Sequence, residues 1–354
     1  MAPASPSRFL DFRSDTVTRP TTAMRAAMAQ ADVGDDVFGD DPTINRLQDH
    51  AAAMFGMDAG LYFPTGTQSN LAALMAHCQR GDEVIVGQQA HTYKYEGGGG
   101  AVLGSVQPQP LNNKPDGTLD LAEVEAAIKP DDSHFAITRL IALENTIGGK
   151  VIGRAYLADA IALARRRGLS IHLDGARVFN AAVKLGMPVK DLCAGFDTVS
   201  ACLSKGLGAP AGTVLVGKRE VIDRARRIRK MVGGAMRQAG VLAAGGLYAL
   251  ERHVDRLAED HANAQRLAKG LAALGIASDP VQTNMVFATF PKEICKPLQE
   301  HLRSKDMLCF IDPRTRLVTH LDVDAAGVDA FVAEVGAFLA QNARSLSRAA
   351  AAGA

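Results

Sequence analysis

The sequence predicts an α/β protein, with a large domain built on a mostly parallel sheet and a small α+β domain after it. Short apolar runs alternate with helix-like segments from about residue 61 to residue 217, which predicts the parallel sheet. Apolar residues then recur at helical spacing from 254 to 274, which predicts one long amphipathic helix before a shorter, mixed pattern.

In the large domain the apolar runs predict strands, and the segments between them predict helices. We expect strands at 60–63, 83–86, 140–143, 170–173, 198–203 and 213–216, and helices at 69–77 and 156–167. Sheets of this kind bind their ligands at the carboxyl ends of the strands. The loops after these strands are therefore where we expect the chemistry.

The last third of the chain predicts the small domain. We expect strands at 284–289 and 316–321 and helices at 297–305 and 328–343. Pro297 suits the first position of its helix, where a missing N–H costs nothing. We place the large domain at 9–245, the small domain at 246–345, and disordered ends at 1–8 and 346–354.

The composition excludes several classes of protein. The chain has 354 residues, 22% of them charged and 47% hydrophobic, which is typical of a globular protein rather than a disordered or fibrous one. A net charge of +1 provides no field that would attract nucleic acid or an anionic membrane. The best apolar stretch, 240–250, is too short to span a membrane, and the start lacks the apolar region of a secretory signal.

The cysteines and histidines indicate neither disulfides nor a metal site. Five scattered cysteines form no CxxC pair, so we expect buried, reduced thiols and a cytoplasmic location. The pairs His172/Asp174 and His320/Asp322 are not at the spacing of helical metal ligands, and no HExxH motif occurs. We therefore expect no metal.

Lys205 is the most informative residue of the sequence. It lies in the stretch 201–217, which contains no other charge and five glycines or prolines. A lysine that loses its hydration in such a setting has a lowered pKa and can form a Schiff base. The alternative is a surface lysine at the end of a strand.

Asp174 ends the apolar run SIHLD and precedes a glycine, which places its carboxylate at the tip of a buried strand. A buried carboxylate needs a cationic partner, and the ring nitrogen of pyridoxal phosphate is one. Asp174 and Lys205 are 31 residues apart, about one βαβ step. A pair between Asp174 and Arg177 with a capping role remains the alternative.

Two further segments could contact such a cofactor. The run from Thr65 through Gly66 and Thr67 leads from a strand into a helix, where backbone N–H groups favour a phosphate, although ordinary helix caps look the same. His91 follows the strand EVIVG and could stack on a planar ring. A hydrogen-bonded loop histidine without chemical use is the alternative.

Eight segments occur in an order that resembles one family. They are DFRSDTVTRP (11–20), VGDDVFGDDP (33–42), FPTGTQSN (63–70), ALENT (142–146), HLDGAR (172–177), CLSKGLGAPAG (202–212), RKMVGGAMRQ (229–238) and RLVTHLD (316–322). Together they resemble the pyridoxal-phosphate-dependent L-threonine aldolases of low specificity, over residues 9–339.

The resemblance implies the aspartate aminotransferase type of fold (PLP fold type I), assembled as a homotetramer of two dimers. It also implies an aldehyde-lyase that cleaves L-threonine, L-allo-threonine and other β-hydroxy-α-amino acids to glycine and an aldehyde. Two rival functions stay open. One is another reaction on the same cofactor, β-elimination or transamination, and the other is a cofactor-free protein with a structural lysine.

The roles of the site residues follow from the same resemblance. Lys205 corresponds to the Schiff-base lysine, Asp174 to the partner of the ring nitrogen, and His91 to the stacking histidine. The remaining expected contacts are Gly66, Thr67 and Ser204 for the phosphate, Ser14, Arg177 and Arg316 for the substrate carboxylate, Arg177 also for the cofactor, and Lys230 within the site.

Two positions depart from the family pattern. Ile147 stands where many members have histidine, and Phe38 stands where many have tyrosine. These departures leave the catalytic base open between His91 and an ordered water that it holds. Because isoleucine discriminates only by shape, we expect both threonine diastereomers to be cleaved.

Overall fold

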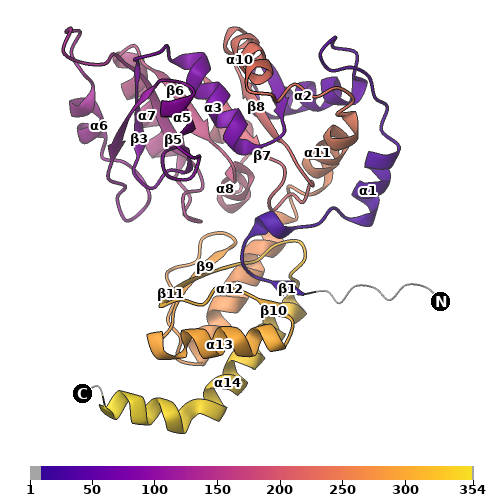
Figure 1. Ribbon diagram of the computed structural model, residues 1–354, viewed down its shortest axis with the longest axis vertical. Helices are drawn as coiled ribbons and strands as arrows, with labels where there is room; N and C mark the ends of the chain where they lie inside the picture. Colours follow the sequence, from indigo (N-terminus) through magenta and orange to yellow (C-terminus); the bar gives the residue numbers. More distant parts are fainter. Residues whose placement is uncertain (1–8, 353–354) are drawn as a thin grey trace. The chain divides into compact units, whose positions relative to one another are not determined.

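The computed structural model describes residues 9–352, with side chains described as far as residue 342. The described chain forms two compact units (Figure 1). The large unit comprises residues 19–255, and the small unit comprises the described residues up to Thr18 together with those from Arg256 onward.

The large unit is built on a seven-stranded sheet, in the order β2-β8-β7-β6-β5-β3-β4. Its strands are β2 (Ala59–Phe63), β3 (Glu83–Gly87), β4 (Gln107–Leu111), β5 (Thr138–Glu144), β6 (Ser170–Asp174), β7 (Thr198–Cys202) and β8 (Thr213–Gly217). Only β8 runs against its neighbours, β2 and β7, while all the other pairs are parallel. The predicted mostly parallel sheet is therefore confirmed.

Eleven helices of the large unit surround this sheet. They are α1 (Thr22–Ala29), α2 (Pro42–Phe55), α3 (Gly66–His77), α4 (His91–Lys94), α5 (Gly99–Val102), α6 (Leu121–Ala127), α7 (Arg154–Arg166), α8 (Val178–Leu185), α9 (Val189–Leu192), α10 (Arg219–Met231) and α11 (Gly240–Arg252). Alanines of α3 and aliphatic residues of α10 pack on β2 and β8 in one buried cluster. This packing fixes α3 beside the strands that end at the candidate site.

β4 is a strand that the sequence analysis did not predict, because its sequence QPQPL contains Pro108 and Pro110. Proline cannot donate to a sheet, so it is confined to edges. β4 is the last strand of the order and pairs only with β3. An edge position therefore explains how a segment with two prolines can be a strand.

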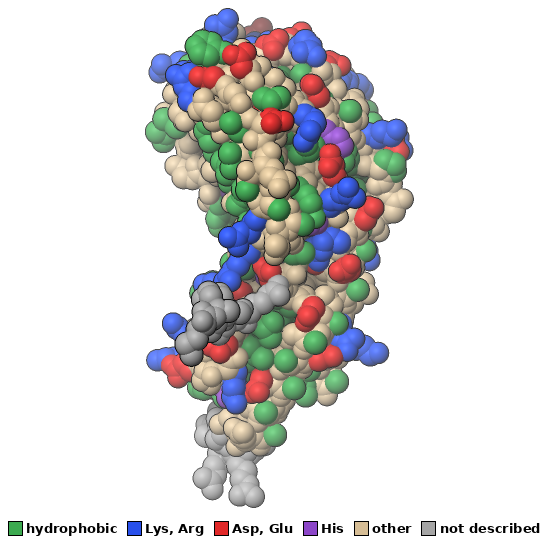
Figure 2. Space-filling model, turned by 90° about the vertical axis from the view of Figure 1, so that its right-hand side faces the viewer, with side chains coloured by type: hydrophobic (Ala, Val, Ile, Leu, Met, Phe, Trp, Pro, Cys, Tyr) green, Lys and Arg blue, Asp and Glu red, His purple; other side chains and the backbone are tan. Residues whose placement is uncertain are grey.

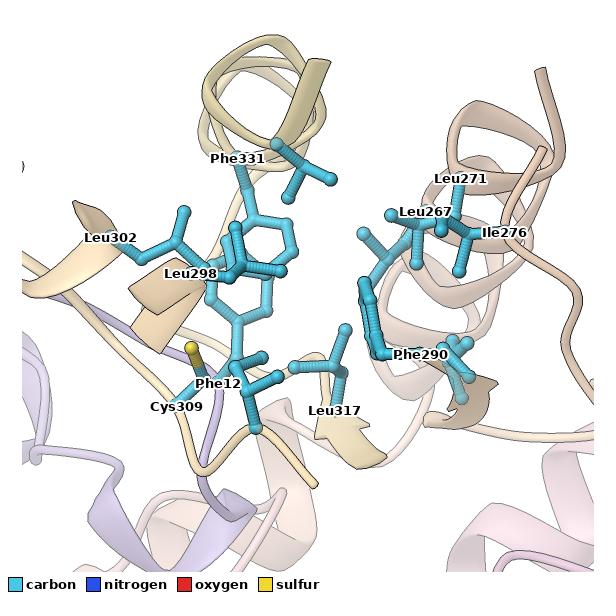
Figure 3. Packing of buried hydrophobic residues seen from close by; sticks show 14 of the residues in the cluster. Phe12, Leu267, Leu271, Ile276, Phe290, Leu298, Leu302, Cys309, Leu317 and Phe331 are labelled. Carbon is cyan, nitrogen blue, oxygen red and sulfur yellow. The ribbon is translucent and has the colours of Figure 1, made fainter. Parts of the chain in front are cut away.

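The small unit contains β1 (Leu10–Asp11), the 3-10 helix η1 (Asp15–Val17), α12 (Leu257–Ala273), β9 (Met285–Thr289), α13 (Lys292–Ser304), β10 (Met307–Leu308), β11 (Arg314–Val318) and α14 (Ala325–Ala352). β9 and β11 are antiparallel. Phe12, Leu298, Leu317 and Phe331 lie in its core, with the two phenylalanine rings 4.5 Å apart (Figure 3).

The unit boundaries differ from the expected domains at 9–245 and 246–345. β1 pairs in parallel with β10, and Phe12 is fully buried in the core of the small unit. These long-range contacts, which no local pattern reveals, join the first described residues to the C-terminal part of the chain. The other boundary falls between Asp255 and Arg256, just before α12.

Two expectations about the helices of the small unit are corrected. Pro297 lies inside α13 rather than at its start, because the helix already begins at Lys292. The Pro297 side chain is exposed, so water can satisfy the carbonyl that its missing N–H leaves without a helical partner. A disordered tail was expected from residue 346, but α14 continues to Ala352, where alanine, the best helix former, predominates.

Other expectations concern the ends, the cysteines and the surface. Residues 1–8, expected to be disordered, lie outside the described part of the chain. All five cysteines are buried and free, as predicted. Among the described residues, no helix is both long and apolar enough to cross a membrane. Figure 2 shows basic and acidic side chains interspersed on one face, in keeping with the net charge of +1.

Candidate active site

Five strands bring the predicted residues of the large unit to one edge of the sheet. β2, β3, β5, β6 and β7 point the same way, so their carboxyl ends meet. Gly66 follows β2, His91 follows β3, and Lys205 follows β7, while Asp174 is the last residue of β6. His91 interacts electrostatically with both Asp174 and Lys205, which shows that the strand ends converge.

Asp174 is almost completely buried, with 2% of its surface exposed. Its Oδ2 accepts a hydrogen bond from Nδ2 of Asn70 at 2.9 Å, and its Oδ1 accepts one from the backbone N–H of Ala176 at 3.0 Å. The second bond caps the turn after β6, which agrees with the capping role of the alternative, although its donor is Ala176 and not the expected Arg177. Two neutral donors do not neutralise a buried carboxylate, so the site suits a cationic group.

The start of α3 forms a cradle for an anion. Thr65 caps the helix by accepting the backbone N–H of Gln68 at 3.2 Å, and the next backbone N–H groups belong to Gly66 and Thr67. The first N–H groups of a helix have no acceptor within it. A Cβ atom at Gly66 would lie 2.9 Å from Sγ of Cys202, so only glycine fits here without displacement of β7. The cradle fits a phosphate.

His91 is half-buried and held at two points. Its Nδ1 lies 2.9 Å from Oε1 of Glu96, and its backbone N–H donates to Oε2 of Glu144 at 2.7 Å. The hydrogen bond with Glu96 raises the pKa of His91 against the opposing effect of burial, and the charge of Asp174 adds to this rise. The imidazole is therefore oriented and made more basic than a free histidine.

Glu96, Asn70 and Glu144 are site residues that the sequence analysis did not single out. Asn70 and Glu144 lie within the motifs FPTGTQSN and ALENT, and Glu96 follows His91 by five residues, so the motifs contained a signal for two of the three. Asn70 donates to Oε1 of Glu96 at 2.8 Å as well as to Asp174. Burial and the nearby Asp174 raise the pKa of Glu144 to about 8.

The close approach of His91, Glu96 and Asp174 does not require a metal. One polar atom from each of these side chains lies within 4.8 Å of the others. The amide of Asn70 bridges the two carboxylates, and His91 bonds directly to Glu96. Because these hydrogen bonds account for the cluster, we assign no metal to it.

Comparisons with known proteins identify the family. The family described as beta-eliminating lyase matches residues 11–293. A low specificity L-threonine aldolase of Escherichia coli O157:H7 is 53% identical over 332 residues, which cover 94% of this chain and 100% of the relative. The low-specificity L-threonine aldolase 1 of Arabidopsis thaliana is 44% identical and covers 91% of this chain and 94% of its own. The chain belongs to the low-specificity L-threonine aldolases, within the beta-eliminating lyases.

Solved structures agree with the fold of a threonine aldolase. The threonine aldolase of Leishmania major superposes with a TM-score of 0.79 at 24% identity, over 93% of this chain and 99% of that one. A serine palmitoyltransferase of Sphingomonas wittichii gives a TM-score of 0.76 at 17% identity, over 95% and 88%. These matches confirm the expected PLP fold type I, and the family confirms a lyase that uses pyridoxal phosphate.

The structure shows where the other expected residues of this threonine aldolase lie. Ser204 and Lys205 are half-buried in the turn after β7, and Arg177 precedes α8. Lys230 is exposed near the end of α10. The large unit thus contains every expected residue except two.

Ser14 and Arg316 belong to the small unit of this threonine aldolase. Ser14 accepts the backbone N–H of Thr16 at 3.2 Å, and Nη2 of Arg316 on β11 donates to the backbone oxygen of Arg13 at 3.2 Å. Arg316 is therefore next in space to the residue that precedes Ser14.

The two departures from the threonine aldolase pattern have different settings. Ile147 is 8% exposed, and its Cγ2 would lie only 2.3 Å from a Cβ atom on Gly117. Its side chain therefore points into the protein beside Gly117, where it lines a small cavity with Ile152. Phe38, by contrast, is 76% exposed.

Proposed function

We propose that this threonine aldolase cleaves L-threonine, L-allo-threonine and other β-hydroxy-α-amino acids to glycine and an aldehyde. The single observation that carries the proposal is the convergence of Lys205, Asp174 and the His91–Glu96 pair on one edge of the sheet. An amine, a buried carboxylate and an oriented base are the groups that such a reaction needs.

The residues of this edge fit pyridoxal phosphate. Gly66 and Thr67 would hold the phosphate with Ser204 near it, Asp174 the ring nitrogen, His91 the ring face, and Lys205 the reactive carbon. When bound, the cofactor would supply an electron sink for the pair that is released as the Cα–Cβ bond of the substrate breaks.

Arginines orient the substrate in this proposal. Arg177 and Arg316, with Ser14, bind the substrate carboxylate, because a guanidinium offers a carboxylate two parallel hydrogen bonds. A carboxylate fixed in this way would set which bond at Cα is aligned for cleavage. Orientation of the Cα–Cβ bond in that position selects cleavage over loss of the Cα proton.

Proton movements complete the reaction. His91, or a water that it holds, removes the proton of the β-hydroxyl, so that the hydroxyl oxygen becomes the carbonyl oxygen of the leaving aldehyde. A proton then returns to Cα and gives glycine. The charge of Glu96 supports His91 as the acceptor of the first proton.

We also propose a homotetramer of two dimers in the cytoplasm, without nucleic-acid or membrane partners. Val33, Val37 and Phe38 are exposed on one loop, and Met231 is 73% exposed at the end of α10. An ion pair between Asp36 and Arg229 ties this loop to α10. Such exposed apolar side chains favour a protein interface, and Lys230 beside Met231 would reach a neighbouring site.

Product analysis of the cofactor-loaded enzyme tests the function. With L-threonine and no added keto acid, we expect glycine and acetaldehyde in equal amounts. Ammonia with a 2-keto acid would show β-elimination instead, and a requirement for an added keto acid would show transamination. Either result would replace the proposed activity.

A further inference from the structure

Buried polar side chains form a continuous chain of hydrogen bonds behind His91. The chain begins at His77, whose Nε2 lies 2.9 Å from Thr198 Oγ1, and Thr198 Oγ1 lies 2.8 Å from His172 Nδ1. His172 Nε2 then lies 3.2 Å from Asn70 Oδ1. Asn70 Nδ2 bonds to Glu96 Oε1 (2.8 Å) and to Asp174 Oδ2 (2.9 Å), and Glu96 Oε1 lies 2.9 Å from His91 Nδ1. The chain connects the half-buried His91, through the buried Asn70, His172 and Thr198, to the half-buried His77 at the end of α3.

Chemistry fixes the direction of the bonds that Asn70 makes. The two carboxylates, Glu96 and Asp174, can only accept while they are ionised, so the amide must point its two N–H groups at them. Its oxygen then accepts the N–H of His172 Nε2. A flipped amide would place its oxygen against two carboxylate oxygens, which is repulsive.

The buried His172 and the half-buried His77 are consistent with this direction. Burial lowers the pKa of His77 to about 4 and that of His172 to about 3, so each ring is neutral and carries a single proton. His172 uses its proton on Asn70, so its Nδ1 accepts the hydroxyl proton of Thr198. The Thr198 oxygen in turn accepts the N–H of His77. Each member of the chain therefore has one orientation that satisfies it.

At the other end of the chain, Glu96 fixes the proton of His91. Oε1 of Glu96 accepts from Asn70 and also lies 2.9 Å from Nδ1 of His91. An ionised carboxylate oxygen can only accept, so Nδ1 carries a proton and Nε2 remains the nitrogen that can take one. A carboxylate that orients a histidine in this way is the usual partner of a histidine base.

Four titratable groups surround His91. Glu96 and Asp174 raise its pKa, Lys205 lowers it, and Glu144 accepts its backbone N–H. Glu96 is the only one of these four whose side chain bonds to the imidazole, among the contacts of the described residues.

We propose that Glu96 is a positioning residue for the aldolase reaction. It fixes His91 with Nδ1 protonated and Nε2 available for the β-hydroxyl proton, and Asn70 supports it by bridging Glu96 to Asp174. This inference rests on the proposed function, because it assigns Nε2 of His91 to the proton of the substrate.

Glu96→Gln separates this role from a merely structural one. Glutamine has the same shape, and its oxygen can still accept from Asn70 and His91, but its charge is gone. We expect the pKa of His91 to fall by about one unit, because an opposite charge at this distance is worth about one to three units. The acid limb of the pH profile of kcat/KM should move to lower pH by the same amount, with a lower plateau. If Glu96 has only a structural role, kcat/KM should be lower in Glu96→Gln while the acid limb of its pH profile stays at the same pH.

Titration of His91 by NMR provides a readout that needs no turnover. The cofactor-loaded enzyme carries histidine labelled with carbon-13 at Cε1, and the His91→Phe spectrum identifies the signal of His91. Glu96→Asp keeps the charge, so its His91 pKa should lie closer to that of the wild type than the pKa in Glu96→Gln. Asp132→Asn is the matched control, since it removes the carboxylate from a similar but exposed pair with His134. It should leave the titration of His91 unchanged.

The outcomes are decisive in either direction. A wild-type His91 pKa above its ordinary value of about 6.5, lowered in Glu96→Gln together with the acid limb, supports the proposal. A wild-type pKa at or below that value overturns it, even if Glu96→Gln does not fold. The proposal is also overturned if the pKa of His91 is unchanged in Glu96→Gln, or if that pKa is lowered while the acid limb of kcat/KM stays in place. Failure of the proposed function would instead appear as absence of glycine in the wild type, with the titration still measurable.

Discussion

Asp36 and Arg229 form an ion pair of 2.6 Å whose side chains are only 2% and 3% exposed. Arg229 also donates to the backbone oxygen of Tyr62 on β2 at 2.7 Å. The pair therefore ties the loop that contains Phe38, and the end of α10 that contains Lys230, to the central sheet. Both elements belong to the surface for which we propose contact with a second subunit.

We expect Arg229→Met to destabilise the protein strongly, because it leaves Asp36 buried without a counter-charge. Loss of one partner of a buried pair costs about 3–5 kcal/mol. Urea unfolding measures the loss, and the double variant Asp36→Asn/Arg229→Met should recover a large part of it. As a control, Arg266→Ala breaks an exposed pair with Asp329 and should change stability little. A double variant as unstable as Arg229→Met would contradict this account.

Two histidines with lowered pKa values predict an acid-sensitive fold. His77 and His172 have folded-state pKa values of about 4 and about 3, below the unfolded value of 6.5. Their stabilising effect is complete above pH 6.5 and is lost as the pH falls towards 4, because the unfolded chain takes up protons that the folded protein excludes. Each group lowers the free energy of unfolding by about 1.4 kcal/mol per pH unit in that range.

His77→Gln tests this pH dependence. The variant should show a shallower fall in the free energy of unfolding between pH 6.5 and pH 4.5 than the wild type, by about the slope of one group. Glu144, with its raised pKa of about 8, makes the free energy of unfolding rise as the pH falls, which opposes the effect of the histidines. The slope of His77→Gln must therefore be compared with the slope of the wild type, which contains the same Glu144. His134→Gln removes an exposed histidine and should keep the wild-type slope. Equal slopes in His77→Gln and wild type would refute the assignment.

The packing of Ile147 changes what its substitution should do. Because its side chain lies beside Gly117 and lines a small, mostly apolar cavity with Ile152, Ile147→His would place a polar ring in a confined apolar space. We expect a loss of about 1–3 kcal/mol in stability and little change in the ratio of kcat/KM for L-threonine and L-allo-threonine. A changed ratio at wild-type stability would show that the side chain at 147 contacts the substrate.

Arg316→Lys tests the binding of the substrate carboxylate. Lysine keeps the charge but loses the two-pronged fit, so kcat/KM should fall roughly ten- to a hundredfold. The affinity for pyridoxal phosphate should stay near that of the wild type, as measured by titration of the cofactor absorbance. If the affinity falls and the substrate constants do not move, Arg316 contacts the phosphate or has a structural role.

Local patterns were sufficient to predict the sheet and to place Asp174 and Lys205 at the ends of two of its strands. Asp174 and Lys205 could be predicted because each follows a short apolar run. The partners of His91 and Asp174 could not, since Asn70 bonds to Glu96 and to Asp174 across 26 and 104 residues of sequence. Asn70 reaches both carboxylates because α3 packs against the sheet, which no local pattern in the sequence shows.

Other features escaped prediction for the same reason. β4 contains two prolines that only an edge position tolerates, and a sequence does not state which strand lies at an edge. Likewise, the segment of Leu10 and Phe12 joins the small unit through pairing with β10, about 300 residues later in the chain.

The central claim is that Lys205 and the strand ends around it carry out the cleavage. The most direct measurement is kcat/KM for L-threonine and L-allo-threonine in the wild type and in Lys205→Ala, together with the visible absorbance of bound pyridoxal phosphate. We predict that the wild type is yellow and releases glycine from both diastereomers, while folded Lys205→Ala has lost both the band and the cleavage. Near-wild-type cleavage by Lys205→Ala would contradict the account.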